Sequence, residues 1–526
     1  MTSSSQPASG WALAIDLGTS GLKVGAIGVD GTILATHEVA LRLQFVGDGG
    51  VEQDTDEWWD GIRDGVQHLL AQGQRPDELL AVGITGQYGS TVPVGADRRA
   101  AGPCLVWADQ RGERYAKKAF GGPAAGYDPR IVVPWLRYTA GLPSTSGSDP
   151  SGHALHLRYA DQRTYRAAQW LLEPVDFIGL RLTGEVAATP TSMVATWLTD
   201  NRPESQQEPR YVPRLIELAR READKLPPLL PSGGVLGSLS AQAADDLGLR
   251  AGVPVASGVT DLHAAHVGSG TLGHKRAHFA VSTTSWISCA LPFKKTDAFH
   301  QIASIPGVRA GEYLMINNQE TAGASLQWLR DGVLGPGPGL PDDWSPSYDG
   351  LTELAATSEP GARGVMFMPW LKGERSPVDD LRLRAGFINL SLGTTRADLV
   401  RAVLEGVAYD FRWVVEFADK FAGQRLEPLR MLGGGARSTL WAQTYADVLD
   451  RRVERVQRPD VAQLRGVAFL ALVATGHLKW DDVEERIPVD RTFDPDPSTR
   501  RLHDDRYAAF RGAHRSLKGW YHKLAR

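Results

Sequence analysis

The feature that most constrains this chain is a pattern that occurs twice: an apolar segment, a turn of small and hydroxyl residues, and a second apolar segment. The first copy is WALAIDLGTSGLKVGAIGVDGTILA, residues 11–35, and the second is KRAHFAVSTTSWISCAL, residues 275–291. Glycine and small polar residues permit the tight turn of a hairpin. The repetition favours an internally duplicated fold, although two unrelated hairpins would show the same pattern. A hairpin does not need the aspartate at position 16, so Asp16 requires another explanation.

The length of 526 residues exceeds what one hydrophobic core usually serves, so we expect two domains, or three. Glycine becomes frequent between Ser257 and Gly273, which predicts a boundary there. We expect domains at 11–258 and 259–490, followed by a C-terminal tail at 491–526. The block 335–350 is rich in turn residues and is expected to be a surface insertion.

Composition excludes several classes of partner. A formal net charge of −4 gives no indication of a nucleic-acid groove or an anionic membrane as partner. The two cysteines, Cys104 and Cys289, argue against a disulfide scaffold or a thiolate zinc site and suit a reducing compartment. Residues 1–10 lack the features of a signal peptide, and no apolar run is long enough to span a bilayer. We therefore expect a cytoplasmic protein with no nucleic-acid or membrane partner.

Strand-like and helix-like segments alternate through the N-terminal region. A helix is expected over residues 54–72, starting at a capping aspartate, and residues 79–89 are typical of a strand that ends in a glycine-rich loop. This order predicts a mostly parallel α/β layer. Residues 396–421 show the apolar stripe of a long helix, and residues 427–450 are typical of a strand, a glycine turn and a helix.

Three turns rich in glycine or hydroxyl residues each follow an apolar strand: DLGTSG, VSTTSW and LGGGARS. Such turns present backbone N–H groups and hydroxyls to an anion, and glycine allows a ligand to approach the backbone. One such turn is usually an ordinary turn, but three in one chain favour a site for nucleotide phosphates. None has the spacing of a P-loop or of a dinucleotide-binding motif, so neither class of enzyme is expected.

Phosphoryl transfer to an alcohol requires a cation and a base. Mg²⁺ is the usual cation, and Asp16, at the mouth of the first turn, suits metal binding directly or through water. Asp261, at a strand-to-helix transition, is a candidate for the base that accepts the hydroxyl proton. Taken alone, a helix N-cap is the simpler explanation of Asp261. His263 and His266 lie nearby, but no third metal ligand accompanies them, so a packing role is favoured.

In their shared order, these segments resemble the FGGY family of carbohydrate kinases, within the actin, Hsp70 and hexokinase superfamily. AIDLGTSGLKVG resembles the first phosphate motif of the family, VSTTSW the second, and LGGGARSTLWAQTYADVL the adenosine motif. GITGQYGSTVPV and GPCLVWADQRG resemble the sugar-site strand pair of xylulokinases, and GVTDLHAAHVGSG the segment of the catalytic aspartate. GVMFMPWLKGERSP and RADLVRAVLEGVAYDF resemble the C-terminal signature region. The resemblance extends from about residue 11 to residue 476.

The resemblance implies an α/β fold of two actin-like (ribonuclease H-like) domains with a central cleft, with ATP against the C-terminal domain and the sugar against the N-terminal one. It implies ATP and Mg²⁺ as cofactors, Asp16 as the metal residue acting through bound water, and Asp261 as the catalytic base. The residues implied for ATP are Gly18, Thr19, Ser20, Lys23, Thr283, Thr284, Gly434, Gly435 and Ser438. Those implied for the sugar are Gln87, Tyr88, Gly89, Trp107, Asp109, Arg111 and Asp261.

The chain also departs from the family pattern. Xylulokinases usually have Met-His where Tyr88 and Gly89 stand, and Asn where Leu262 follows the aspartate. A buried hydroxyl left without a partner costs about 1–3 kcal/mol, so these changes are expected to alter substrate choice. Ser282 replaces a usual glycine in the second phosphate motif, and Arg465 interrupts a helix of small residues.

The resemblance therefore implies a ketose kinase, with D-xylulose as the leading substrate. The alternatives are a kinase for another ketose or polyol, of the ribulose, glycerol or erythritol type, and a catalytically weak sugar or nucleotide sensor of the same fold. The expected partners are a small-molecule sugar and ATP, and a homodimer is a possible assembly.

Overall fold

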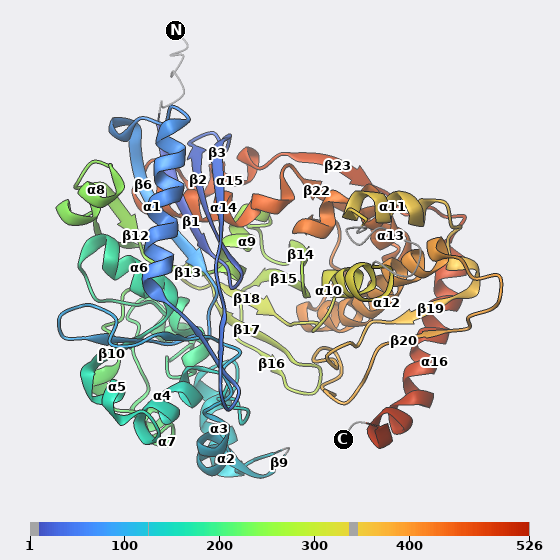
Figure 1. Ribbon diagram of the computed structural model, residues 1–526, viewed down its shortest axis with the longest axis horizontal. Coiled ribbons are helices and arrows are strands. Elements are labelled where there is room, and N and C mark those ends of the chain that lie inside the picture. The colour runs from blue at the N-terminus through green and yellow to red at the C-terminus, as the bar shows by residue number, and fades with distance from the viewer. Residues whose placement is uncertain (1–9, 125, 336–345, 525–526) are drawn as a thin grey trace.

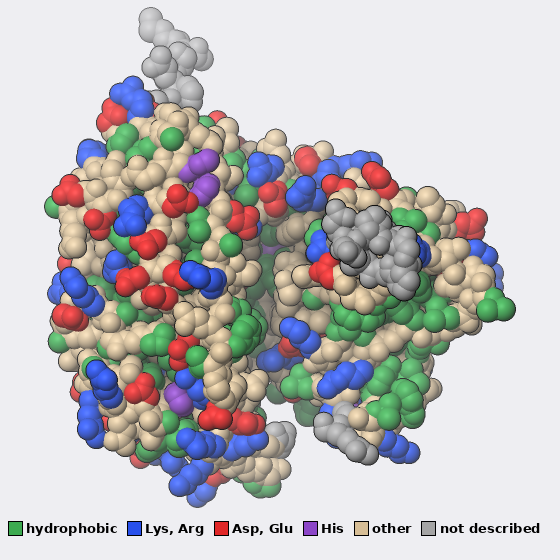
Figure 2. Space-filling view, viewed as in Figure 1, with side chains coloured by type: hydrophobic (Ala, Val, Ile, Leu, Met, Phe, Trp, Pro, Cys, Tyr) green, Lys and Arg blue, Asp and Glu red, His purple; other side chains and the backbone are tan. Residues whose placement is uncertain are grey.

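The computed structural model describes residues 10–124, 126–335 and 346–524. Two α/β halves lie side by side, each built around one large β-sheet (Figure 1). Figure 2 shows a groove between the two halves on the face in view. The leader at 1–9 and residues 336–345 of the turn-rich block lie outside the described residues. No helix in the described ranges is long and apolar enough to cross a membrane.

The opening hairpin forms the middle of the N-terminal sheet, with one antiparallel partner and one parallel partner for its first strand. In spatial order the strands are β11 (Val235–Ser238), β12 (Pro254–Ala256), β6 (Leu79–Gly86), β1 (Trp11–Leu17), β2 (Gly21–Gly28) and β3 (Ile33–Ala40), with β13 (Val259–Thr260) also pairing with β6. The strands β12, β6 and β1 run parallel, whereas β2, β3 and β11 pair antiparallel. The sheet is therefore mixed, and the expectation of a mostly parallel layer is wrong, because the hairpin contributes antiparallel strands.

The C-terminal sheet repeats this order around the second hairpin. Its strands are β16 (Thr296–Asp297), β17 (Ile302–Pro306), β18 (Tyr313–Ile316), β15 (Ser285–Leu291), β14 (Ala277–Val281), β21 (Leu429–Leu432), β22 (Val453–Val456) and β23 (Val489–Phe493). The hairpin strands β14 and β15 pair antiparallel, and β14, β21 and β22 run parallel, as β1, β6 and β12 do in the other sheet. The repeated hairpin in the sequence thus marks a repeated sheet order.

Shorter strands and the helices complete each half. The shorter strands are β4 (Gln44–Val46), β5 (Gly50–Gln53), β7 (Val92–Gly95), β8 (Cys104–Leu105), β9 (Gly121–Ala124), β10 (Ala168–Leu172), β19 (Met366–Met368) and β20 (Gly386–Ile388). The helices of the N-terminal half are α1 (Thr55–Ala71), α2 (Glu113–Phe120), α3 (Pro129–Tyr138), α4 (Pro150–Tyr159), α5 (Gln162–Ala167), α6 (Pro174–Thr183), α7 (Pro213–Leu218) and α8 (Ala241–Leu247). Those that follow are α9 (Asp261–Ser269), α10 (Gly323–Trp328), α11 (Tyr348–Ala356), α12 (Arg396–Ala422), α13 (Thr439–Leu449), α14 (Ala462–Ala474), α15 (Trp480–Val483) and α16 (Arg500–Leu524).

Two of the expected helices begin with a side-chain cap, and for the first of them the sequence predicted the capping aspartate. Asp54 accepts the backbone N–H of Asp56 at 2.9 Å at the start of α1. Thr395 and Asp398 form a reciprocal capping box at the start of α12, which buries most of its length. The segment 491–526 includes α16, whose Phe510 packs with the C-terminal core, so this segment is an integral part of that half.

Helices α9 and α14 cross closely beneath the N-terminal sheet, although α14 belongs to the last part of the chain. Their crossing depends on two glycines that face the partner helix. A Cβ atom on Gly268 would lie 1.8 Å from the carbonyl oxygen of Ala462, and one on Gly466 would lie 1.9 Å from that of Ala264. Helix α14 also packs on β1 and β6. This contact fixes the position of α9, whose first residue is Asp261.

We expect Gly466→Ala to lower the free energy of unfolding by about 3 kcal/mol, because the added methyl group would overlap the backbone of α9 and push the helices apart. Urea denaturation followed by circular dichroism measures this change. Gly512→Ala on α16 is the matched control, since a Cβ there meets nothing within 4 Å and alanine favours helix. Equal stability of the two variants would contradict the close packing of α9 on α14.

Candidate active site

Asp16 lies at the end of β1, where the strand opens into the first glycine-rich turn. It pairs with Lys23 on β2, which pairs in turn with Glu38 on β3. The N–H of Gly18 donates to the carbonyl of Gly21 at 2.9 Å and closes the turn. Burial raises the pKa of the Asp16 carboxyl to about 6. The Lys23 ammonium lowers this pKa, and the Glu38 carboxylate raises it. A bound cation would offset the cost of ionising this group.

Asp261 comes close to Asp16 because their strands end at the same level on either side of β6. The parallel strands β1 and β13 flank β6, ending at Leu17 and Thr260, so the two carboxylates lie at the same edge of the sheet. Burial raises the pKa of Asp261 to about 7, and the charge of Asp16 adds to the shift. Thr260 occupies the N-cap position of α9, whereas Asp261 is the first helical residue and accepts the N–H of Leu262 at 2.8 Å. Capping therefore does not explain Asp261.

The first phosphate turn is hydrogen-bonded to the loop expected to bind the sugar. The Thr19 hydroxyl donates to Gln87 Oε1 at 3.1 Å and accepts from Trp107 Nε1 at 3.0 Å. Gln53 joins both, because its Nε2 donates to the Thr19 carbonyl at 2.8 Å and its Oε1 accepts from Gln87 at 2.7 Å. The predicted residues Thr19, Gln87 and Trp107 thus belong to one network. Sequence reasoning missed Gln53, which sits at the end of a short strand with no motif around it.

A buried glutamate supports the loop that carries Tyr88 and Gly89. Glu173 accepts the N–H of Gly89 at 3.3 Å and that of Ser90 at 3.2 Å. Burial raises the pKa of Glu173 well above its usual range. Burial also raises the pKa of the Tyr88 phenol, with contributions from the charges of Asp261 and Glu173, so Tyr88 lies near the candidate base. Glu173 was not among the predicted site residues. The only sign of it in the sequence is that a single charged residue stands between apolar residues just before α6.

Asp109 and Arg111, predicted to bind the sugar, bind mainly each other and the adjoining strand. Arg111 Nε and Nη2 donate to Asp109 Oδ2 at 2.9 and 2.6 Å, and Nη2 also reaches Glu52 at 2.7 Å. Asp109 Oδ2 accepts the N–H of Val51 at 3.0 Å. Burial alone would raise the pKa of Asp109, but the hydrogen bonds from Arg111 outweigh this effect, so the pKa is lowered. These contacts hold the Trp107 loop against β5.

The second phosphate turn joins β14 to β15 and is held by the segment before α10. Ser282 donates its N–H to the Thr284 carbonyl at 2.9 Å. The N–H groups of Ala322 and Gly323 donate to the carbonyls of Thr283 and Ser282 at 2.9 and 2.7 Å. The Thr283 side chain is exposed. Its hydroxyl is therefore free to meet a ligand while its backbone is fixed.

The third turn follows β21, the parallel neighbour of β14, so it lies at the same sheet edge as the second turn. A Cβ on Gly435 would lie 2.6 Å from Val281 Cγ1, which explains a glycine there, whereas Gly434 has open space around it. The Ser438 hydroxyl accepts the N–H of Trp441 at 3.1 Å and caps α13. Of the three predicted residues in this turn, Gly434 is therefore the one with open space for a ligand. Ser438 also has a structural role, because it caps α13.

The residues predicted for ATP therefore gather at the edges of both sheets. Gly18, Thr19, Ser20 and Lys23 belong to the N-terminal turn or its flanking strand, and Thr283, Thr284, Gly434, Gly435 and Ser438 to the C-terminal edge. These residues thus lie at or beside turns that follow β1, β14 and β21 in the two sheets.

The departures from the family pattern have different surroundings. Leu262 is buried in an apolar cluster with residues of α9 and α14, and Arg465 is buried on α14, where its Nη2 donates to the Gln457 carbonyl at 3.0 Å. Ser282 is exposed at the second phosphate turn. Of these three, Ser282 alone is exposed.

The donor set fits Mg²⁺ better than a metal that needs several protein ligands. In the described part of the chain, no group of three or more His, Cys, Asp or Glu residues could hold a metal ion. His263 is hydrogen-bonded at both ring nitrogens, to Thr260 and to the Pro306 carbonyl. Mg²⁺ keeps several waters and uses one or two carboxylates with substrate phosphates, which the buried Asp16 can supply.

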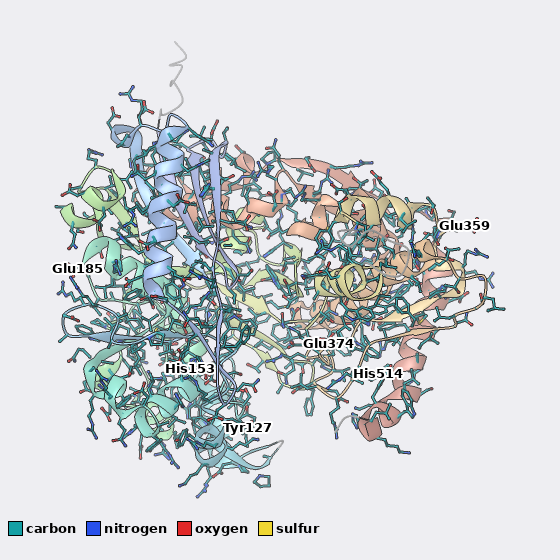
Figure 3. All side chains as sticks on the ribbon, viewed as in Figure 1. Tyr127, His153, Glu185, Glu359, Glu374 and His514 are labelled. Atoms are coloured by element: carbon teal, nitrogen blue, oxygen red, sulfur yellow. The ribbon has the colours of Figure 1, made fainter. Side chains whose placement is uncertain are left out.

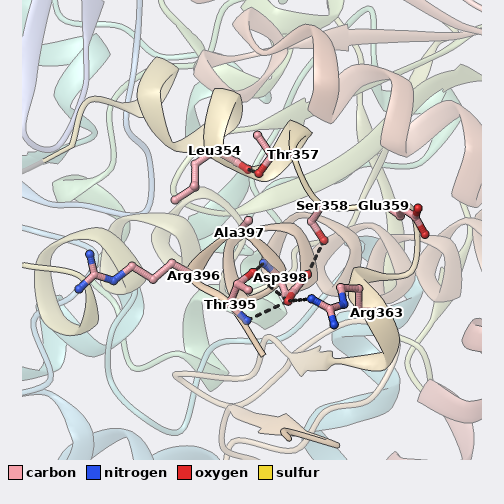
Figure 4. Close-up of a pocket in the computed structure, with 9 residues that line it drawn as sticks. All are labelled: Leu354, Thr357, Ser358, Glu359, Arg363, Thr395, Arg396, Ala397 and Asp398. Carbon is pink, nitrogen blue, oxygen red and sulfur yellow. Dashed lines mark hydrogen bonds and ion pairs between the residues drawn. The ribbon is translucent and has the colours of Figure 1, made fainter. Parts of the chain in front are cut away.

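A cavity of about 560 Å³ lies elsewhere in the C-terminal half, between the end of α11 and the start of α12 (Figure 4). Its polar lining includes Ser358, which bonds to Asp398, and Arg363, which faces the same carboxylate. None of the predicted site residues lines it. The candidate active site is therefore the convergence of turns and carboxylates described above, not this cavity.

Comparison with protein families accounts for most of the chain. Residues 11–122 and 151–268 match the N-terminal domain of the FGGY family of carbohydrate kinases, and residues 288–475 match the C-terminal domain of that family. A xylulose kinase of Staphylococcus epidermidis is 25% identical over 516 residues, covering 96% of this chain and 97% of the relative. A glycerol kinase of Gloeobacter violaceus is 29% identical over 494 residues, covering 92% and 93%.

Solved structures show the same fold. A xylulose kinase from Rhodospirillum rubrum superimposes with a TM-score of 0.81 at 24% identity, covering 97% of this chain and 100% of the other. A glycerol kinase from Plasmodium falciparum, solved with ADP, gives a TM-score of 0.79 at 18% identity, covering 98% and 99%. The expected two-domain α/β fold of the actin-like class is thereby confirmed.

Proposed function

Since this chain belongs to the FGGY family of carbohydrate kinases, and is therefore an ATP-dependent sugar phosphotransferase, we propose that its acceptor is a ketose, with D-xylulose as the first candidate. The observation that carries the mechanism is the pairing of Asp16 and Asp261 at one sheet edge, with the charge of one raising the pKa of the other. A carboxylate with a raised pKa is a better proton acceptor than an ordinary one.

In this proposal Asp261 accepts the proton of the sugar hydroxyl as that oxygen attacks the γ-phosphorus of ATP, and the bond from the γ-phosphorus to the bridging oxygen breaks so that ADP leaves. Asp16 would hold Mg²⁺ through water, and the chemistry that the ion would supply when bound is neutralisation of the phosphate charge. The exposed Thr283 hydroxyl and the backbone of the first turn donate hydrogen bonds to phosphate oxygens. Because these groups come from both halves, closure of the groove would assemble them and exclude water as a competing acceptor.

The proposed sugar pocket is formed by Tyr88, Trp107 and Asp261. Tyr88 presents an aromatic ring at the start of the pair where xylulokinases usually carry Met-His, and the Trp107 side chain is about half exposed. Aromatic faces suit the C–H surface of a ring or an extended sugar better than a small polyol. This favours a ketose over glycerol, which is the second candidate because of the glycerol kinase relative.

A coupled assay of ADP release with D-xylulose, D-ribulose, erythritol and glycerol tests this choice. We expect D-xylulose to give a kcat/KM at least about tenfold above that of glycerol, which corresponds to one well-placed contact. A higher kcat/KM for glycerol would overturn the substrate assignment and leave the kinase assignment standing. Nucleotide binding without release of ADP on any acceptor would favour the sensor alternative.

The pH dependence of kcat/KM for the sugar should report the base. Asp261 must be ionised to accept a proton, so we expect kcat/KM to rise with pH through the pKa of about 7 and to level off above it. Removing the negative charge in Asp16→Asn should move this rise to lower pH, because that charge raises the pKa of Asp261. A flat profile between pH 5 and pH 8 would speak against Asp261 as the base.

The division at 11–258 and 259–490, the cytoplasmic location and the homodimer remain predictions. Both cysteines are buried and unpaired, which supports a reducing compartment. Size-exclusion chromatography with light scattering would test the dimer.

A further inference from the structure

A buried pair of acidic side chains lies behind the second phosphate turn, outside the residues assigned above. Glu374, in the C-terminal half (Figure 3), and Asp410 of α12 are both almost completely buried and influence each other's pKa, and the adjacent residues Gln319 and Glu320 donate hydrogen bonds to Asp410 and Glu374 respectively. Two ionised carboxylates would repel strongly in such a place, so buried acidic pairs are kept only where a proton or a cation joins them.

The hydrogen bonds around the pair assign the proton. Asp410 accepts at both oxygens, from Gln319 Nε2 at 2.8 Å and from Trp370 Nε1 at 3.2 Å, as an ionised carboxylate does. Glu374 Oε1 accepts two backbone N–H groups, from Glu320 at 3.1 Å and from Arg375 at 2.7 Å. Among the described residues no donor reaches Glu374 Oε2. A proton on this oxygen turns its contact with Asp410 into a hydrogen bond.

The environment agrees with that assignment. Burial raises the pKa of the Glu374 carboxyl, and the charge of Asp410 raises it further. The guanidinium of Arg375, the residue after Glu374, is directed to Glu320, since its Nε lies 2.7 Å from Glu320 Oε1. No other positive side chain in the described ranges is seen to pair with Glu374 or Asp410. Burial without a paired cation favours one shared proton on the two carboxyls over two negative charges.

The pair is connected to the second phosphate turn by a short path of hydrogen bonds. It holds the side chain of Gln319 and the backbone of Glu320. Gln319 in turn exchanges backbone hydrogen bonds with Ser285, at 2.8 and 3.4 Å. Three residues further on, the segment donates N–H groups to the carbonyls of Thr283 and Ser282. The turn thus rests on a segment that the acidic pair anchors.

We propose that Glu374 and Asp410 share one proton and act as positioning residues, holding the segment 319–324 so that the Thr283 turn keeps the geometry needed for phosphoryl transfer. This inference rests on the proposed role of Thr283 in binding the γ-phosphate. It assigns Glu374 as the donor and Asp410 as the acceptor, so substitutions of the two residues should not be equivalent.

The test compares Glu374→Gln with Asp410→Asn in the full-length protein. Glutamine reproduces a protonated glutamate, with an acceptor for the two backbone N–H groups and a donor toward Asp410, so kcat should stay within about twofold of wild type. Asparagine directs an N–H₂ group at donors that need an acceptor, so kcat should fall by about 10- to 100-fold while the KM for the sugar changes little. Equal loss in both variants, or no loss in Asp410→Asn, would overturn the assignment.

Glu405→Gln is the matched control. Glu405 is buried on the same helix α12, pairs with Arg401 at 2.8 Å, and accepts the N–H of Gly361, away from the segment 319–324. This variant should lower the melting temperature without lowering kcat at temperatures well below melting. A fall in kcat equal to that of Asp410→Asn would show that any buried charge change on α12 has this effect, and would contradict the proposal.

Amide hydrogen exchange gives a readout independent of turnover. Asp410→Asn should speed exchange in peptides that cover residues 282–285 and 319–324, whereas Glu374→Gln should not. If wild type releases no ADP with any sugar, the proposed function fails, yet the exchange pattern still decides the positioning role. If Asp410→Asn does not fold, Glu374→Gln and Glu374→Ala replace the comparison, because only the alanine variant lacks both the donor and the acceptor. Exchange as slow as in wild type in both Glu374→Gln and Glu374→Ala would contradict the proposal.

Discussion

Asp261→Asn should reduce kcat by about a thousandfold, the middle of the range that a general base contributes. Asparagine has the shape of aspartate and can still accept the N–H of Leu262, so the start of α9 should keep its structure. It cannot accept a proton from the sugar hydroxyl. The KM for the sugar should change by less than about threefold, because the amide can still hydrogen-bond the hydroxyl in the ground state.

Steady-state kinetics with saturating Mg²⁺ and ATP measure this effect, and circular dichroism verifies the fold. The comparison variant is Asp54→Asn, which changes an aspartate at the start of another helix, where it caps α1 through Asp56. We expect it to leave kcat unchanged. If Asp261→Asn retained more than about a tenth of wild-type kcat, its carboxylate would not be the base.

Asp16→Asn should reduce kcat by about a hundredfold or more, in the range reported for groups that stabilise transition-state charge. The amide has no charge with which to hold the waters of Mg²⁺, so the dependence of the rate on Mg²⁺ concentration should shift to higher values. Removing one of two neighbouring buried carboxylates should also raise the melting temperature of the free protein, because the remaining one is then easier to ionise.

Titration of the rate with Mg²⁺ at fixed ATP distinguishes this effect from general damage. Glu38→Gln is the control, since Glu38 also lies near Asp16 but on the exposed side of β3, and it should change kcat by less than about threefold. An Asp16→Asn variant with an unchanged Mg²⁺ dependence would exclude the metal role of this residue.

The repeated hairpin was a hint of a duplicated fold that two unrelated hairpins would also have explained, and it did not indicate the exact sheet. Local sequence identifies strands and turns, because glycine and hydroxyl residues follow apolar runs at DLGTSG and VSTTSW. It does not state which strands become neighbours. The parallel pairing of β1 with β6 and the packing of α14 on both depend on contacts between residues far apart in the chain. The mixed character of the sheet followed from those contacts.

The site could be predicted in the same partial way. Asp16 and Asp261 stand in recognisable segments, and the structure places them together. Gln53, Glu173 and Asp410 were not assigned a role, because each acts through a hydrogen bond to a residue distant in sequence. Asp109 and Arg111 show the reverse case, since their motif is visible but their observed partners are each other. Sequence motifs therefore reveal the residues that contact a ligand. They seldom reveal the residues that hold those contact residues in place.

The most direct test of the central claim is ³¹P NMR of wild type and Asp261→Asn incubated with D-xylulose, ATP and Mg²⁺. Wild type should convert the γ-phosphate signal into a sugar phosphomonoester signal with a matching amount of ADP, and Asp261→Asn should produce neither at a comparable rate. Inorganic phosphate in place of the phosphomonoester, or equal rates in the two proteins, would contradict a sugar kinase that uses Asp261 as its base.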